Sequence, residues 1–137
     1  MNAMGIREVQ LRIFTAPERF RTTVAYYKML TDGIVTLYFP FPERGLELAS
    51  ISSPAGSFLI IAGAAAALAP FHGTALTILV TDIDSVATNL VPLGAEVLQE
   101  RTPVPTGYQT RLRHPDGLVV EYVQHTAAAD RFRTTDL

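Results

Sequence analysis

Apolar and polar residues alternate along several short segments in the first half of the chain, as they do in strands with one buried face. In the segment 8–14, Val9, Leu11 and Ile13 share one face of the predicted strand. Its other face is polar and holds Glu8, Gln10 and Arg12. Further strands are predicted at 34–39, 46–52 and 57–62, with a proline-containing turn or loop at 39–44.

A helical pattern follows the first strand. Thr15, Pro17 and Glu18 form a capping arrangement that predicts the start of a helix, which we expect to run to about residue 31. Gly33 marks its end. Apolar residues recur at helical spacing and should pack against the sheet, namely Phe20, Val24, Tyr27 and Leu30. The order of this half is therefore strand, helix and three strands.

The second half repeats this order. It predicts a strand at 75–80, a helix at 84–93, a strand at 96–100 and a strand-turn-strand at 109–124. The apolar residues expected on the inner side of this helix are Val86, Leu90 and Leu93. Residues 53–56 fall on 114–117, and residues 13–15 fall on 79–81, when one half is moved along the other. Two βαβββ modules are therefore expected, each with one sheet face that its helix leaves uncovered.

The hairpin at 109–124 is the best-specified local structure in the sequence. Pro115, Asp116 and Gly117 suit a three-residue turn in which the glycine takes a left-handed conformation. This turn sets Arg111 opposite Glu121. A carboxylate therefore lies within an apolar strand and faces an arginine, either as part of a ligand site or as a cross-strand ion pair.

Composition and charge narrow the function classes. The chain has 137 residues, a formal net charge of −2 and no cysteine, which excludes disulfides and thiolate chemistry. Basic residues form no stripe, so we expect no nucleic-acid partner. The longest apolar run, 58–71, is shorter than the about 20 residues of a membrane span, so we expect no membrane partner. No secretory signal is visible at the N-terminus, so a cytoplasmic location is expected.

With this order of elements, the chain resembles the vicinal oxygen chelate superfamily, which includes glyoxalase I, bleomycin resistance proteins and extradiol dioxygenases. The resemblance rests on the paired βαβββ order, on the segments 26–27, 80–84 and 93–97, and on Pro115-Asp116-Gly117 followed by Glu121. It implies an α+β fold in which two paired modules form curled mixed sheets around a cavity, with the helices outside. We expect one domain over 1–137, with modules at about 7–63 and 73–125, a flexible tail at 126–137, and a homodimer.

The resemblance also indicates where metal ligands would lie. The positions that hold them in the superfamily correspond here to Glu8, Thr74, Ile60 and Glu121. Two carboxylates remain and no imidazole does, whereas a catalytic zinc or iron site needs about three protein ligands. We therefore expect no cofactor and no complete transition-metal site. The alternative is a hard divalent cation that Glu8 and Glu121 hold with water or substrate.

Two function classes remain open. In the first, the protein binds a small, partly apolar organic molecule in the cavity. The residues predicted to contact it are Arg111, Gln10, Arg113, Tyr38 and Ser50, together with Glu121. In the second, the protein is a lyase, isomerase or ring-forming enzyme, glyoxalase-like or dioxygenase-like, in which Glu8 and Glu121 act as acid and base or as cation ligands. His125, at the end of the last strand, is expected to be solvated.

Overall fold

The computed structural model describes residues 3–137, which divide into two compact units. The N-terminal unit comprises Gln10–Gly73 and Phe132–Leu137. The C-terminal unit comprises Thr74–Arg131 and residues 3–9. No helix within residues 3–137 is long and apolar enough to cross a membrane.

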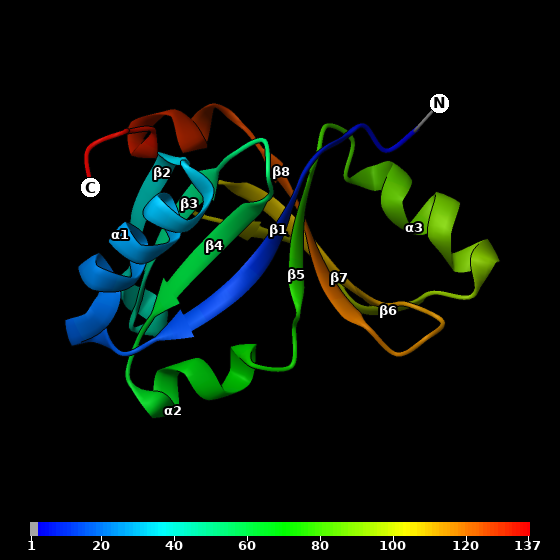
Figure 1. Ribbon diagram of the computed structural model, residues 1–137. Coiled ribbons are helices and arrows are strands. Elements are labelled where there is room, and N and C mark those ends of the chain that lie inside the picture. The colour runs from blue at the N-terminus through cyan, green and yellow to red at the C-terminus, as the bar shows by residue number, and fades with distance from the viewer. Residues whose placement is uncertain (1–2) are drawn as a thin grey trace. The chain divides into compact units, whose positions relative to one another are not determined.

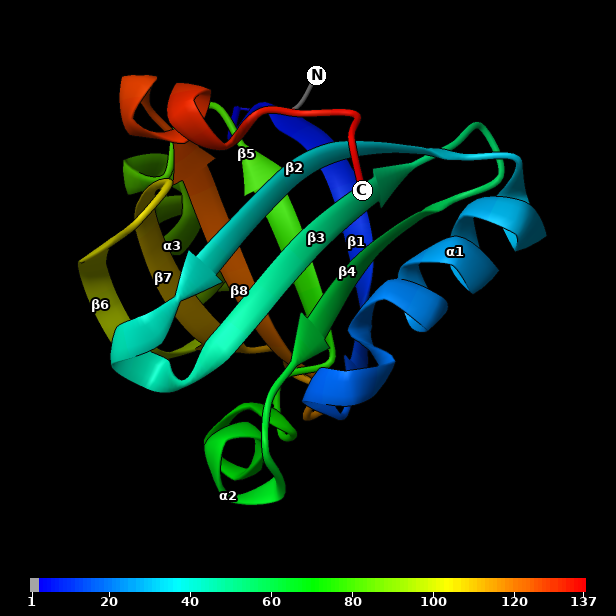
Figure 2. The same ribbon diagram turned by 90° about the vertical axis from the view of Figure 1, so that its left-hand side faces the viewer.

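The N-terminal unit has the predicted βαβββ order. Its strands lie in the order β2-β3-β4-β1, where β1 and β4 are parallel and the other neighbours are antiparallel. Figure 2 shows these strands with α1. The elements are β1 (Ile6–Thr15), α1 (Phe20–Thr31), β2 (Ile34–Phe41), β3 (Leu46–Ser52), β4 (Ser57–Ala62) and the short α2 (Ala65–Leu68).

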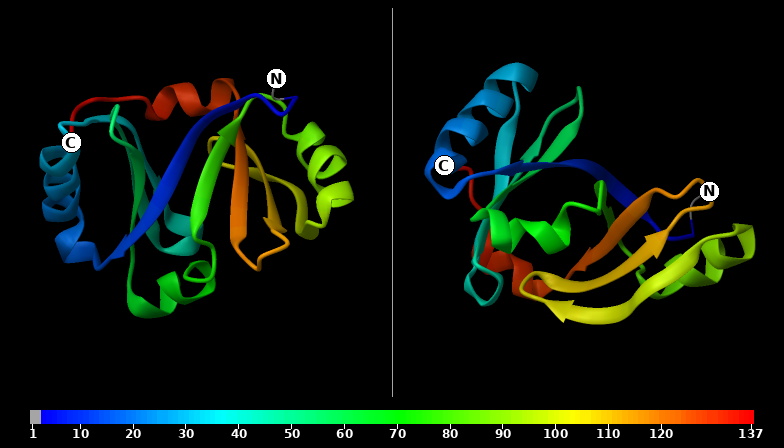
Figure 3. Two further views of the ribbon diagram at one scale, coloured as in Figure 1. Left: turned by 45° about the vertical axis from the view of Figure 1, so that its right-hand side comes forward. Right: turned by 90° about the horizontal axis from the view of Figure 1, so that it is seen from below.

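The C-terminal unit repeats this topology, with the strand order β5-β8-β7-β6 and a parallel β5·β8 pair. The helix α3 lies beside these strands (Figure 1; Figure 3, left). The elements are β5 (Leu76–Val80), α3 (Asp84–Leu90), β6 (Glu96–Val104), β7 (Gly107–Arg113) and β8 (Val119–His125). In both units the first strand pairs with the fourth, so the α+β class and the βαβββ repeat are confirmed.

Each helix closes a separate apolar core against its own sheet. In the N-terminal unit Phe20 and Val24 of α1 pack with Val35, Ala49, Ile51, Ile60 and Ala62 of the strands. In the C-terminal unit Val86 of α3 packs with residues of the sheet and of the segment before the helix, namely Ile78, Val80, Ile83, Ala95, Leu112, Val120 and Tyr122. The predictions for Leu30 and Leu93 were wrong, because both side chains are largely exposed at the helix ends.

The start of the first helix also differs from the prediction. Pro17–Arg19 form a 3-10 turn, and the α-helix begins only at Phe20. The hydroxyls of Thr15 and Thr23 share a hydrogen bond at 3.1 Å, so Thr15 does not cap the helix. The helix ends at Asp32, which has a φ of 52°, with the Gly33 amide donating to Lys28 O.

The burial of β1 is the reverse of what its pattern predicted. The polar residues Gln10 and Arg12 are 1% and 8% exposed, whereas the apolar residues Val9 and Leu11 are 47% and 46% exposed. The reason is that α1 packs on β3 and β4, which leaves this side of β1 largely uncovered. The polar face of β1 is therefore an interior face.

The last residues of the chain are folded against the N-terminal unit. The segment predicted as a flexible tail contains a 3-10 helix, Ala127–Phe132. The Phe132 ring then lies 5.4 Å from that of Phe39, centroid to centroid, and Leu137 packs against the core of this unit. Two strand ends also differ from the prediction, since β2 continues through Pro40 and β6 extends to Val104.

Candidate ligand-binding site

A row of four polar residues crosses the sheet of the C-terminal unit. Thr77 on β5 lies beside Glu121 on β8. Glu121 lies opposite Arg111 on β7, and Arg111 lies opposite Gln99 on β6. Because the neighbouring positions of β5, β7 and β8 pack toward α3, strand alternation places this row on the face that α3 leaves uncovered. We call these four residues the polar row.

Two buried polar atoms at the polar row lack a hydrogen-bond partner within the described chain. They are Oγ1 of Thr77, a residue that is 2% exposed, and Oε1 of Gln109, a residue that is 7% exposed. Gln109 lies next to the row on the same face of β7, and its Nε2 donates to Gln99 Oε1 at 2.7 Å. Buried polar groups are almost always paired, and an unpaired one costs about 1–3 kcal/mol. This face therefore offers two unused hydrogen-bonding positions.

The charged residues at the centre of the row lie as the hairpin predicted. Arg111 and Glu121 are directly opposite each other and both are half-buried. The Gly117 amide donates to His114 O at 2.8 Å, and Gly117 has a φ of 95°, so the predicted turn is confirmed. A guanidinium donates to carboxylates and phosphates, while a carboxylate accepts hydroxyl and amide donors. The pair can thus recognise a ligand that carries an anionic group and a donor.

Arg113 shares this side of β7 but lies nearer the turn. Its guanidinium donates to Glu96 Oε1 on β6 in an exposed ion pair. Because this partner holds it at the surface, Arg113 stands apart from the polar row.

The N-terminal unit brings two predicted residues together. Gln10 Nε2 donates to Ser50 Oγ at 3.2 Å, and both residues are buried on the sheet face opposite α1. Arg12 lies two residues further along the same face of β1 and was not predicted as a ligand residue. The signal available in the sequence was its position two residues after Gln10, on the same polar face of the predicted strand.

Tyr38 does not join Gln10 and Ser50. A β-bulge between Val35 and Leu37 reverses the alternation of β2, and the Tyr38 ring packs 5.9 Å from that of Phe20 on the α1 side. Its hydroxyl donates to Glu47 Oε2 at 2.7 Å, and this hydrogen bond is the main reason that the pKa of Tyr38 is raised from 10.0.

No protein-family model matches the sequence, and no curated protein gives a significant match. Solved structures do match. A crystal structure of an uncharacterized protein from Methanosarcina mazei is 37% identical, with a TM-score of 0.77, and the match covers 90% of this chain and 95% of that one. The chain belongs to the same family as that protein.

Methylmalonyl-CoA epimerases, which are vicinal oxygen chelate proteins, are more distant structural neighbours. The enzyme from Mycobacterium tuberculosis is 16% identical with a TM-score of 0.61, and the match covers 89% of this chain and 88% of that one. A variant of the Streptomyces coelicolor enzyme in complex with 2-nitronate-propionyl-CoA is 21% identical with a TM-score of 0.56, covering 91% and 99%. These likenesses confirm that this chain has the vicinal oxygen chelate-like fold.

The residue of the N-terminal unit that corresponds to Glu121 differs from the one predicted from the sequence. Ile60, the counterpart expected from the sequence, packs toward α1, whereas Glu121 lies on the face away from α3. The turn between β7 and β8 is one residue longer than that between β3 and β4, and a shift of one residue reverses every side chain. The β4 residues on the corresponding face are Leu59 and Ile61, which are also apolar.

Glu8, the second predicted acid, is half-buried on β1 at a position that alternates with the exposed Val9. Among residues 3–137, no group of three or more histidine, cysteine, aspartate or glutamate side chains is placed to hold a metal ion. Thr74, the other position at which the superfamily places a ligand, is buried two residues before β5.

Proposed function

We propose that this protein binds a small, partly apolar organic molecule at the polar row of its C-terminal unit. The observation that carries the proposal is the pair of buried, unpartnered atoms, Thr77 Oγ1 and Gln109 Oε1, next to Glu121 and Arg111. Folded proteins rarely retain such atoms unless a ligand or water completes their hydrogen bonds. A bound ligand would do so here.

The surroundings of the row define the chemistry of this ligand. Arg111 suits a carboxylate, while Glu121 and Gln109 Oε1 suit hydroxyl or amide donors. Leu79 and Val123, adjacent across β5 and β8 on the same face, provide an apolar surface beside the row. The ligand class is therefore an organic acid with an apolar part. Acyl thioesters of dicarboxylic acids, such as the methylmalonyl-CoA bound by a related epimerase, belong to this class.

Calorimetric titration tests the proposal with methylmalonyl-CoA, propionyl-CoA and free methylmalonate as probes. We expect the carboxylate-bearing probes to bind more tightly than propionyl-CoA. Glu121→Gln and Arg111→Met should each weaken binding by roughly tenfold or more, the loss of one charge-assisted hydrogen bond. The exposed Glu100→Gln on β6 is the matched control and should bind as the wild type does. Equal affinities for all three variants would contradict the proposal.

The second candidate is an enzyme that moves a proton beside a carbonyl group. The presence of epimerases among the structural neighbours favours it, with Glu121 and Glu8 as the proposed acid and base. If this holds, the wild type should exchange the α-hydrogen of methylmalonyl-CoA for deuterium in D₂O. Glu121→Gln should then leave binding nearly intact and abolish exchange, which separates a base from an anchor.

We further propose that neither function needs a complete transition-metal site or another cofactor. Glu8 and Glu121 supply only oxygen ligands, and Leu59 and Ile61 provide no ligand on β4. Elemental analysis of the purified protein should find far less than one transition metal per chain. A stoichiometric metal that is lost in Glu121→Gln would contradict this. The expected homodimer also remains a prediction, which light scattering checks.

A further inference from the structure

A small pocket lies beside the ends of β5 and β8 and the first residues of β1. It has a volume of about 130 Å³ and is lined by Arg7, Leu79, Val80, Thr81, Gln124 and His125. Thr81 and His125 each lie four residues beyond the polar row on their strands, from Thr77 and Glu121 respectively, a distance of about 13 Å. The pocket is therefore distinct from the polar row, although Leu79 borders both, and the inference drawn from it does not depend on that row.

Hydrogen-bond donors converge on this pocket. Gln124 Oε1 accepts from the backbone amide of Ile83 at 2.9 Å, which fixes the side-chain amide and leaves its Nε2 hydrogens available. Within residues 3–137, neither the Thr81 hydroxyl nor the Arg7 guanidinium has a side-chain hydrogen bond or ion pair. The imidazole of His125 completes the polar lining.

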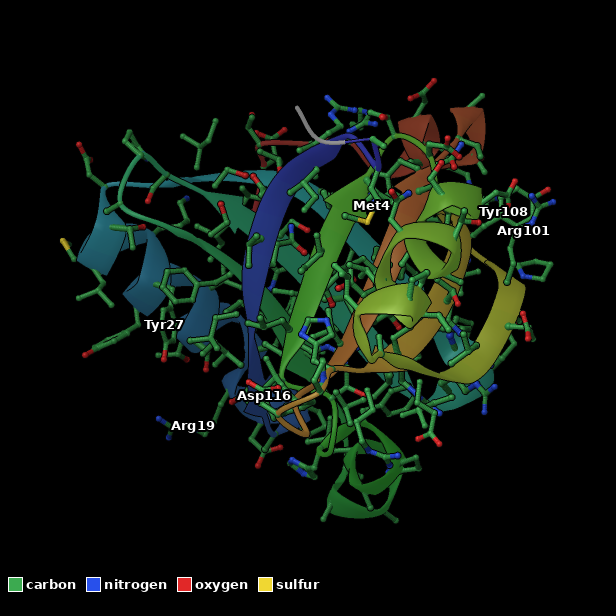
Figure 4. All side chains as sticks on the ribbon, turned by 90° about the vertical axis from the view of Figure 1, so that its right-hand side faces the viewer. Met4, Arg19, Tyr27, Arg101, Tyr108 and Asp116 are labelled. Atoms are coloured by element: carbon green, nitrogen blue, oxygen red, sulfur yellow. The ribbon has the colours of Figure 1, made fainter. Side chains whose placement is uncertain are left out.

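The pocket is held in place by the segment before β1. The amide of Thr81 donates to Gly5 O at 2.9 Å, and that of Asp82 donates to Met4 O at 3.1 Å; Met4 is labelled in Figure 4. Gly5 has a φ of 64°, and a Cβ at this position would lie 1.8 Å from Thr81 Oγ1. The close contact requires glycine here, and it positions the threonine hydroxyl before any ligand arrives.

The charge around the pocket favours an anion. Its lining includes an arginine and a histidine but no carboxylate. The two acids that follow Thr81 in the chain have other partners, since Asp82 accepts from the Ser85 hydroxyl at 2.5 Å and Asp84 pairs with Arg101 at 3.1 Å. The volume equals that of about four water molecules in the liquid, which suits one oxyanion group rather than a whole metabolite.

We propose that this pocket binds a phosphate group, with Arg7, Thr81 and Gln124 as its donors. The arginine supplies a charge-assisted, fork-shaped contact, and the neutral donors satisfy the remaining oxygens. The group can be inorganic phosphate or the end of a phosphomonoester. Both ligands carry the same phosphate group, so the test uses one probe of each kind.

Two-dimensional NMR titration of the full chain tests this, with inorganic phosphate and glycerol 3-phosphate as probes and sodium chloride as the ionic-strength control. We expect saturable shifts of the Thr81 and Gln124 amides with either phosphate probe and none with chloride. Tighter binding of glycerol 3-phosphate would identify a phosphomonoester site. Equal binding would identify a site for the phosphate group alone, and either result supports the proposal.

Two variants test whether phosphate binds in this pocket. Gln124→Glu keeps an acceptor for the Ile83 amide but replaces the side-chain N–H donors with a negatively charged oxygen. Arg7→Gln removes the exposed positive charge. Each variant should weaken phosphate binding roughly tenfold or more. Arg44→Gln, at another exposed arginine, is the matched control. Unsaturable shifts in the wild type, or wild-type affinity in both pocket variants, would overturn the proposal. If Gln124→Glu failed to fold, the phosphate affinity of Arg7→Gln would still test the proposal.

Discussion

Thr77 and Thr110 are both buried threonines of the C-terminal unit, yet only one of their hydroxyls has a hydrogen-bond partner in the described chain. Thr110 donates to Gln99 O at 2.7 Å, whereas Thr77 Oγ1 has no partner in the described chain. Replacing Thr77 by valine removes an unsatisfied polar atom without changing the shape of the side chain. We expect Thr77→Val to raise the free energy of unfolding by about 1 kcal/mol, and Thr110→Val to lower it by about as much.

Chemical denaturation of the two variants measures this difference. Thr77→Val should also weaken ligand binding, since a ligand is proposed to be the missing partner. A valine that destabilised the protein equally at both positions would mean that Thr77 already has its hydrogen bond.

Tyr122 predicts a pH dependence of stability. Burial raises the pKa of this phenol from 10.0, because the charged form is poorly solvated in the core. The folded protein then keeps its proton at a pH where the unfolded chain loses it. This stabilising contribution is therefore complete below pH 10.0 and is lost as the pH rises through the folded value.

Tyr122→Phe should make the free energy of unfolding less steep above pH 10.0. It should also cost about 1 kcal/mol at neutral pH, because the hydrogen bond at 2.6 Å with His114 Nε2 is lost. Denaturation measured across the alkaline range checks both effects, with the exposed Tyr26→Phe as the control. An unchanged slope would contradict the proposed role of burial.

The candidate site could be predicted only in part from single residues. The turn and the alternation placed Glu121 opposite Arg111, because this pairing depends on the local register of one hairpin. Gln10 and Ser50 were both predicted as ligand residues, but their hydrogen bond joins β1 and β3, which are not neighbours in the sheet. Thr77, Gln109 and Arg12 were missed because a polar residue in a strand normally indicates solvent. Their burial follows from tertiary packing, which the sequence pattern does not contain.

At the scale of elements, turn chemistry was the most reliable guide. The three-residue turn fixed the pairing of β7 with β8, since Gly117 can take the left-handed conformation. Gly117→Ala should destabilise the protein by about 1–2 kcal/mol through backbone strain alone, because no atom within 4 Å would meet the new methyl group.

The matched control for this change is Gly73→Ala. Its added methyl group also meets nothing within 4 Å, and its backbone is not left-handed, so its stability should change little. Equal melting temperatures for the two variants would show that the turn tolerates any residue.

The sheet face on which a side chain lies was less predictable than the residues at which each strand begins and ends. Strands β3 and β4 were predicted to the residue, yet Ile60 was assigned to the wrong face because one extra turn residue reverses the alternation. The bulge in β2 had the same effect on Tyr38. Neither irregularity leaves a distinct mark on the apolar pattern, so sequence alone could not reveal them.

At the scale of the whole molecule, the paired βαβββ order was predictable because the repeat is carried by many residues at once. The C-terminal segment was not predictable, since its small and charged residues resemble those of a frayed end. Its anchoring depends on a few contacts with the N-terminal unit, such as that between Phe132 and Phe39.

Phe132→Ala should lower the free energy of unfolding by about 1 kcal/mol, a typical value for an aromatic pair. It should also speed hydrogen exchange in the segment that follows. The adjacent exposed residue provides the control variant Arg131→Ala. Wild-type stability and exchange in Phe132→Ala would show that the segment is not held by this contact.

The central claim is that the polar row is a ligand site, and NMR mapping of a bound organic acid tests it most directly. Methylmalonyl-CoA is titrated into labelled protein while the backbone and side-chain signals of the row are followed. The account predicts saturable shifts at Thr77, Gln109, Arg111 and Glu121 in the wild type. In Glu121→Gln, the shifts at Thr77, Gln109 and Arg111 should be much smaller at the same sub-saturating ligand concentration. Saturable binding that leaves these four residues unperturbed in the wild type would contradict it.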